Sequence, residues 1–131
     1  MYLNGLMQGE KYAFLSIVKH LVSVDGDFSD EEQILIDGFL GEMGFSEDPK
    51  SEIGYEDAIE MFTYSTLSVR KKVFIELVGV TLCDEMLHSN EKDFLDNVAL
   101  KFHINEEDKS EMFCIVRQLT EIYRKMALLV E

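Results

Sequence analysis

Apolar side chains recur along most of the chain at intervals of three and four residues, the spacing of an amphipathic helix. The segment from Glu10 to Val24 predicts a first helix with one broad buried face. Its apolar positions are Phe14, Leu15, Ile17, Val18, Leu21, Val22 and Val24. A second helix ends at Gly44, and six of its apolar side chains are predicted to be buried. They are Ile34, Leu35, Ile36, Phe39, Leu40 and Met43.

The rest of the chain predicts one short helix and three longer ones. The short helix covers "YEDAIEMF" within the irregular segment from Phe45 to Thr66, which holds the only proline. No segment alternates with a period of two residues, so the pattern excludes a substantial sheet. The longer helices run from about Ser68 to Cys83, from about Ser89 to Phe102, and from Asn105 nearly to the end of the sequence.

The last predicted helix carries the longest apolar stripe, which we expect to lie in the core. Its members are Met112, Phe113, Ile115, Val116, Leu119, Ile122, Tyr123 and Met126. The two cysteines, Cys83 and Cys114, also lie among apolar residues of predicted helices, where a free thiol behaves as a small buried hydrophobe. Free thiols persist in a reducing compartment, which favours the cytoplasm.

Polar residues mark the ends of these helices. Asp25 and Gly26 end the first helix, because glycine adopts the left-handed conformation that closes many helices. In "SDEE", Ser29 predicts an N-cap whose partner in a capping box is Glu32, three residues later. Asn105 followed by "EED" predicts a similar start for the last helix, with negative charge at the positive end of the helix dipole.

The chain repeats its plan after 59 residues. The shift aligns Asp25 with Asp84 and Glu32 with Glu91, and the apolar positions follow. Among them it pairs Phe14 with Val73, Leu21 with Val80, Leu35 with Phe94, and Met43 with Phe102. Each unit, at about 11–48 and 70–107, consists of a helix, an acidic turn and a helix. Because neither hairpin can bury its apolar face alone, we predict an all-α, single-domain bundle over residues 1–131, completed by the short middle helix and the C-terminal helix.

Charge and composition narrow the range of partners. Of the 131 residues, 47% are apolar, which is enough for a folded core. The net charge is −14, because 26 acidic residues outnumber 12 basic ones. Such a surface repels the phosphates of nucleic acids and anionic lipids, whereas it suits divalent cations or a basic protein surface. No segment has the length or the apolar character of a membrane span or a leader, so we expect a soluble cytoplasmic protein that neither binds nucleic acid nor inserts into a membrane.

The order of these motifs resembles the TerB-like family, the tellurite-resistance protein B superfamily of small all-helical domains. The likeness runs from about Lys11 to Glu107 through "VDGDFSDEE", "LGEMGFSED", "CDEMLHSNE" and "ALKFHINEED". Its most specific element is a doubled pattern of aspartate, apolar residue and glutamate. The two copies are Asp25, Phe28, Glu32 and Asp84, Leu87, Glu91. The second copy departs from the family pattern, because Glu85 stands where the family has glycine.

The resemblance implies a metal site at the four acidic residues of the two turns, and it relates the chain to domains of a membrane-anchored DnaJ-type co-chaperone. The residues are Asp25, Glu32, Asp84 and Glu91. Four carboxylates with water suffice for a hard cation such as calcium or magnesium, which take oxygen ligands. The same residues have structural uses, because Asp25 suits a helix end and Glu32 suits a capping box. An EF-hand loop that starts at Asp25 is excluded, since Ile36 would occupy the position of the bidentate glutamate.

Other polar side chains are interpreted mainly as structural. His88 follows Asp84 by four residues and offers a nitrogen ligand suited to zinc, but a turn histidine is more often exposed or a cap. His20 and His103 lie on or beside apolar faces, where we expect satisfied, partly buried histidines. The basic cluster "SVRKK" begins a helix and is expected to be solvated, with an acidic partner or an acidic turn of this chain as alternatives.

Two functional hypotheses follow, and neither is enzymatic. In the first, the chain is a cytoplasmic binding module of a stress-response assembly that holds a divalent cation (calcium, magnesium, manganese or zinc) through its acidic turns. In the second, it is a metal-independent protein-interaction scaffold whose acidic turns only cap helices. Both involve a protein partner whose identity the residues do not specify. A hydrolase built on the same carboxylates lacks a positioned base or nucleophile.

Overall fold

The computed structural model describes residues 1–23, 30–50, 53–82 and 89–131. Within these ranges the chain forms helices and no strand, which confirms the predicted all-α fold. The predicted helices are all present, with ends close to those expected. The elements are η1 (Leu3–Gly5, a 3-10 helix), α1 (Gln8–Ser23), α2 (Asp30–Glu42), α3 (Tyr55–Thr63), α4 (Leu67–Thr81), α5 (Ser89–Lys101) and α6 (Glu106–Val130).

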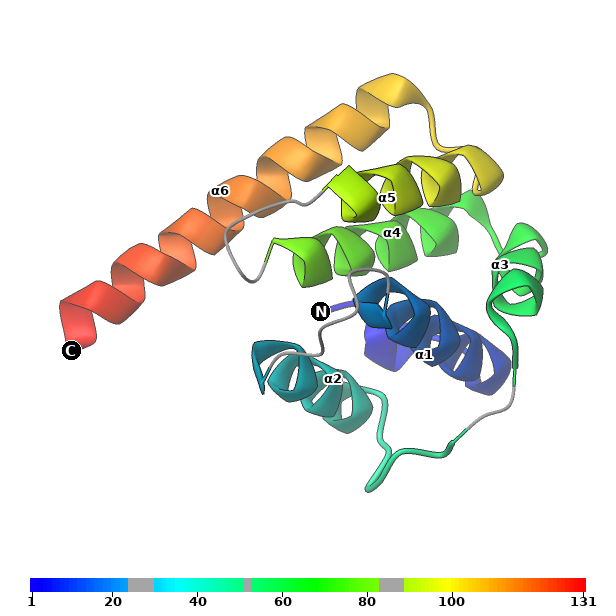
Figure 1. Cartoon of the computed structure of the whole chain (residues 1–131), viewed down its shortest axis with the longest axis horizontal. Helices are drawn as coiled ribbons and strands as arrows, with labels where there is room; N and C mark the ends of the chain where they lie inside the picture. Colours follow the sequence, from blue (N-terminus) through cyan, green and yellow to red (C-terminus); the bar gives the residue numbers. More distant parts are fainter. Residues whose placement is uncertain (24–29, 51–52, 83–88) are drawn as a thin grey trace.

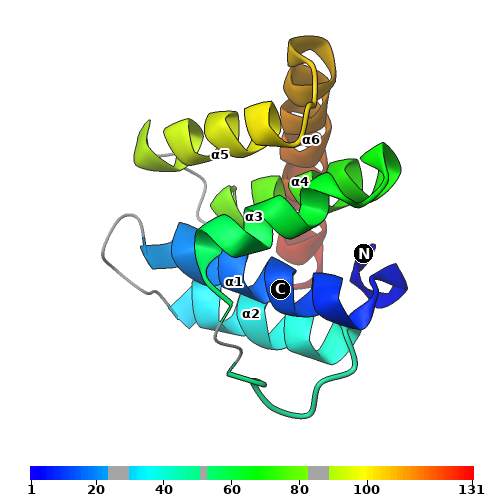
Figure 2. The same cartoon turned by 90° about the vertical axis from the view of Figure 1, so that its right-hand side faces the viewer.

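The helices are arranged as two groups (Figures 1 and 2). In both views α1 and α2 lie together below, and α4 and α5 lie side by side above them. The short α3 packs against α1, and α4 packs against both α5 and α6. The C-terminal turns of α6 extend past the end of α4 (Figure 1). Because α6 leaves the bundle in this way, its two halves have different surroundings.

One cluster of buried side chains connects the two groups. Within the described part of the chain, it draws residues from η1 and from each of the helices α1 to α6. Burial of a large apolar side chain contributes roughly 1.5–3 kcal/mol, so this cluster is the main stabilising feature of the bundle. Its largest fully buried members include Phe14, Phe62, Phe74, Phe102, Leu3, Leu15, Ile17 and Leu21.

The segment before α1 also belongs to the core, although the sequence analysis did not predict this. Leu3 and Leu6 are buried, and the spacing of three residues turns both inwards across η1. The main-chain nitrogen of Tyr2 donates to Glu76 Oε1 at 2.9 Å, and that of Leu3 donates to Glu42 Oε1 at 3.3 Å. The segment therefore joins α2 to α4.

Two of the predicted helix ends are confirmed by their geometry. Asn105 Oδ1 accepts a hydrogen bond from the main-chain nitrogen of Asp108 at 2.7 Å, as an N-cap does. Gly44 follows α2 with a φ of +86°, the left-handed conformation that glycine tolerates best. Thr66 is a further N-cap, which accepts from the nitrogen of Val69 at 3.2 Å. The predicted capping box of Ser29 lies outside the described residues.

A basic side chain from the first helix closes each hairpin. Lys11 Nζ of α1 donates to the main-chain oxygen of Met43 at 2.9 Å, directly after α2. Arg70 Nη1 of α4 donates to the main-chain oxygen of Phe102 at 2.5 Å, directly after α5. Positive charge is favourable there, because the last carbonyl groups of a helix lack helical partners and form the negative end of the dipole.

The basic cluster "SVRKK" is consequently not a solvated helix start, and that expectation was wrong. Arg70 and Lys71 are both half-buried. Lys71 Nζ lies 2.8 Å from Asp108 Oδ2, in the first turn of α6. The cluster therefore meets an acidic residue of its own chain at the start of α6 rather than in one of the two acidic turns, and the contact fixes the start of α6 against α4.

The sequence analysis overestimated burial at several positions. Ile34 is 70% exposed, although its neighbours on α2 face the core, so the buried face of α2 is narrower than predicted. Cys114 is exposed, and Cys83 lies outside the described residues. His20 and His103 are also exposed, and the ring of His20 stacks on another ring, that of Tyr55, with centroids 4.1 Å apart.

Candidate functional site

The structure describes half of the predicted metal ligands. Glu32 lies in the first turn of α2 and Glu91 in the first turn of α5. They are 9% and 7% exposed, which is unusual for carboxylates, and each takes part in an interaction within the chain. Asp25 and Asp84 lie outside the described residues. Buried carboxylates need polar or charged partners, so both glutamates have a structural use whether or not an ion binds.

The described residues do not assemble a metal centre by themselves. Among them, no group of three or more His, Cys, Asp or Glu side chains is placed to hold an ion. His88 also lies outside the described part. The divalent-cation hypothesis therefore depends on what Asp25 and Asp84 add to Glu32 and Glu91.

The apolar side of α6 is the largest departure from the sequence prediction. Met112 and Phe113 are partly buried against the core, and Val116 is the one buried residue of this fully described helix. The stripe then emerges from the bundle, so the expectation that it lies in the core was wrong for its distal part. Its exposed members are Ile115 (53%), Ile122 (53%), Tyr123 (58%) and Met126 (47%), and two apolar residues that extend it along the helix, Leu129 (84%) and Val130 (85%), are also exposed.

Helix lengths explain this exposure. With a rise of 1.5 Å per residue, α6 with its 25 residues is about 37 Å long and α4 with its 15 residues is about 22 Å long. Two helices that pack side by side cover each other only over the length of the shorter one. The difference of ten residues implies that about ten residues of α6 project beyond α4. Figure 1 shows the C-terminal part of α6 extending past α4. The predicted helix lengths already indicate that the last helix is longer than its neighbour, but they do not by themselves show which part of the stripe is exposed.

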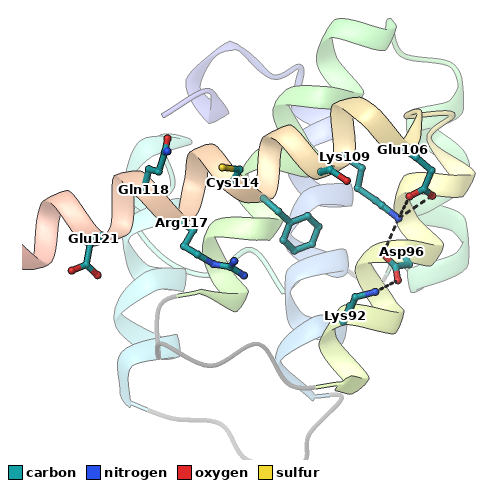
Figure 3. Close-up of a pocket in the computed structure, with 10 residues that line it drawn as sticks. Lys92, Asp96, Glu106, Lys109, Cys114, Arg117, Gln118 and Glu121 are labelled. Carbon is teal, nitrogen blue, oxygen red and sulfur yellow. Dashed lines mark hydrogen bonds and ion pairs between the residues drawn. The ribbon is translucent and has the colours of Figure 1, made fainter.

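A pocket of about 530 Å³ lies on another side of α6, between α6 and α5 (Figure 3). Lys109 Nζ lies 3.0 Å from both Asp96 Oδ1 and Glu106 Oε2, and Lys92 Nζ lies 2.9 Å from Asp96 Oδ2. The side chain of Phe113 adds an apolar wall. These ion pairs link α5 to the N-terminal half of α6, so this half of α6 is held on two sides.

The ion pairs also determine the charge state of the pocket. Burial raises the pKa of Asp96, but the hydrogen bonds and positive charges of Lys92 and Lys109 lower it more, and the net pKa is below the ordinary value. Burial lowers the pKa of Lys109, but Glu106 and Asp96 raise it more, and the net pKa is above the ordinary value. Both groups therefore stay charged at neutral pH.

The acidic groups of this pocket pair with basic ones. Its carboxylates at positions 96, 106 and 121 are all ion-paired, the last with Arg124. No histidine is among its lining residues in the described part of the chain. The pocket is better interpreted as the polar junction of α5 and α6.

Comparison of the chain with family models, with curated proteins and with solved structures found no match. The TerB-like resemblance therefore rests on the motifs of this chain alone. Among the described residues, no helix combines the length and the apolar character needed to cross a lipid bilayer.

Proposed function

We propose that this chain is a non-enzymatic protein-interaction module whose contact surface is the exposed apolar stripe of α6. The observation that carries the proposal is the exposure of Ile122 and Met126 together with their neighbours on the projecting half of the helix. The largest apolar patch on a protein surface often has a function in binding, and a row of exposed apolar side chains along one helix is a patch of this kind. The cytoplasmic location, the TerB-like membership and the exclusion of nucleic acid belong to the same proposal.

The alternative surfaces have less support. The α5–α6 pocket is crossed by ion pairs that already satisfy its charges. The acidic turns have a structural use at Glu32 and Glu91. The stripe of α6 exposes apolar side chains along one face of a projecting helix, and these gain free energy when a partner covers them, at about 25 cal/mol per Å² buried.

Site-specific photo-crosslinking tests the proposal in cells. A photoreactive residue at position 122 should form covalent products, because this position faces the covering partner. The matched control is position 128, because Leu128 is 64% exposed on another side of the same helix and should give few products. Equal labelling at both positions, or none at either, would overturn the proposal.

A second candidate function is the binding of a divalent cation at the acidic turns. It is favoured by one observation, the burial of a glutamate at the same place in α2 and in α5. Thermal unfolding of chelator-treated protein with calcium, magnesium, manganese or zinc tests it. An ion at 100 times its dissociation constant adds about 2.7 kcal/mol to the stability of the folded state. The variant with Asp25→Asn and Asp84→Asn should lose this shift, and an unchanged shift would exclude these residues as ligands.

A further inference from the structure

We infer that the partner that covers the stripe of α6 is a second copy of this chain, with the two α6 helices packed antiparallel. The inference rests on the proposed function and names its partner. It is carried by three features of the described residues, which are the spacing of the stripe, the distribution of charge and the size of the exposed patch.

The spacing is that of a coiled coil. Six apolar residues of α6 follow one another at intervals of three and four, which are the a and d positions of a heptad repeat. They are Met112, Ile115, Leu119, Ile122, Met126 and Leu129. Of the apolar flanking positions, Tyr123 and Val130 are exposed and widen the stripe, whereas Val116 is buried in the core. A helix that only covered the bundle would not need this repeat over about its last ten residues, which project beyond α4.

An antiparallel pair uses the whole stripe. When the two-fold axis passes between Thr120 and Glu121, each a position of one helix faces a d position of the other. Met112 faces Leu129 of the second copy, Ile115 faces Met126, and Leu119 faces Ile122. Such an interface is self-complementary, as a two-fold symmetric dimer requires.

Charge favours this orientation over a parallel one. Residues 117–130 contain three basic side chains and one acidic one, so their net charge is +2. Since the whole chain has a net charge of −14, the remainder of the chain has a net charge of −16. A parallel pair would bring the two acidic bundles together. An antiparallel pair keeps them at opposite ends and places the positive part of each α6 between them, which lowers the repulsion.

The patch is large enough for a dimer. Four side chains of the stripe and the two flanking ones, Tyr123 and Val130, are exposed by about half or more. At roughly 100 Å² for each full side chain, these six present on the order of 400 Å² of apolar surface. Interfaces are about 57% apolar, so a polar rim extends this to roughly 700 Å² on each partner, close to the ~800 Å² of a standard interface. Lipid is a poorer occupant, because the acidic bundle repels anionic head groups.

Sedimentation equilibrium of the full chain tests the dimer. We expect a mass of twice 15.1 kDa at micromolar concentrations for the wild type. The variant with Ile122→Glu and Met126→Glu should sediment as a monomer with unchanged helicity, because both side chains are exposed in the monomer. Leu128→Glu, the matched control off the stripe, should remain a dimer. Added salt should tighten the dimer by screening the acidic bundles.

A monomeric wild type would overturn the inference, and the photo-crosslinks at position 122 then separate two outcomes. Products with a different protein would retain the proposed function with another partner, whereas no products would overturn both.

Cysteine crosslinking tests the orientation, in a background with Cys83→Ser and Cys114→Ser. Ile115→Cys and Met126→Cys chains, mixed before oxidation, should form the mixed disulfide, because the antiparallel pair places these positions opposite each other. Met126→Cys alone should not crosslink, because its two copies would lie about 16 Å apart along the axis. Self-crosslinking of Met126→Cys without the mixed product would establish a parallel pair and overturn the antiparallel assignment.

Discussion

The hairpins α1–α2 and α4–α5 share a local design but differ in what covers them. The bounds of α2 and α5 differ by 59 residues at both ends, and α1 and α4 begin 59 residues apart. The two ties from a basic side chain to a carbonyl group, from Lys11 to Met43 and from Arg70 to Phe102, also have this spacing. The design therefore recurs at the level of single hydrogen bonds, whereas the pseudo-symmetric packing of the two units stays a prediction.

The covering elements break this correspondence. The first hairpin packs on α3 and on the segment of η1, and the second packs on α6. At the corresponding helix ends, Gly44 and His103 both have a positive φ, of 86° and 58°, but only glycine adopts it without strain. The comparison teaches that local motifs fix the turns and the ties, while long-range packing decides which side chains are buried.

The largest expected effect comes from the core residues at the ends of the two hairpins. Phe102→Ala should cost about 3–5 kcal/mol and Met43→Ala about 2–5 kcal/mol of unfolding free energy, because each leaves a cavity. Phe102 is fully buried and its ring lies 5.7 Å from that of Phe62, so we expect the larger loss there. Urea unfolding measures both. Leu100 is 74% exposed, so the control Leu100→Ala should change the unfolding free energy little. A larger loss for Met43→Ala than for Phe102→Ala would contradict the expected order of the two effects.

Removal of the ties should have the next largest effect. Arg70→Met and Lys11→Met each keep an apolar stem and remove the donor, at a cost of about 1–3 kcal/mol for a hydrogen bond from a charged group. The half-buried Arg70 also lies next to Lys71 and its partner Asp108, so its loss should loosen the start of α6. Hydrogen exchange of α6 amides would detect this. Lys125→Met on the exposed side of α6 is the control, and equal exchange in Arg70→Met and the wild type would contradict this role.

The sequence predicted those features that depend on neighbouring residues. Gly44 and Asn105 end and start helices where expected, because caps are decided within a few residues. The exposure of Ile34 and Ile122 was missed, because a helical apolar pattern does not reveal how much of the face another helix covers. For the candidate metal site, burial at Glu32 was likewise not predictable from its capping position.

The two left-handed positions should respond in opposite directions to substitution. Gly44→Ala should cost about 1 kcal/mol, because a Cβ at this φ is strained although no atom lies within 4 Å of it. His103→Gly should stabilise by up to about 1 kcal/mol, since the residue is exposed and glycine adopts its positive φ without strain. Gly38→Ala, inside α2 with an ordinary φ, is the control and should stabilise by about 0.5–1 kcal/mol. Thermal unfolding measures all three, and the same sign at positions 44 and 103 would refute the assignment.

The smallest expected effect concerns the loss of stability at low pH, to which a carboxyl group near each hairpin contributes. The pKa of Asp96 is lowered through Lys92 and Lys109, against the effect of burial, and that of Asp48 is lowered through hydrogen bonds from Lys19 and the main chain. A carboxyl group whose pKa is lower in the folded state adds stability above its ordinary pKa of 3.8, and this contribution disappears as the pH falls through the folded value.

With Asp96→Asn or Asp48→Asn, the free energy of unfolding should therefore fall less steeply below about pH 4 than in the wild type. Each difference should be less than about 1 kcal/mol, because these ion pairs are partly exposed. Urea unfolding between pH 7 and pH 2.5 measures the slope, with Asp93→Asn on the exposed side of α5 as the control. Since Asp96 joins α5 to α6, its variant should also weaken the attachment of α6, and Asp48→Asn should not. Equal effects of the two on α6 hydrogen exchange would mean that the ion pairs of the pocket do not hold the helix.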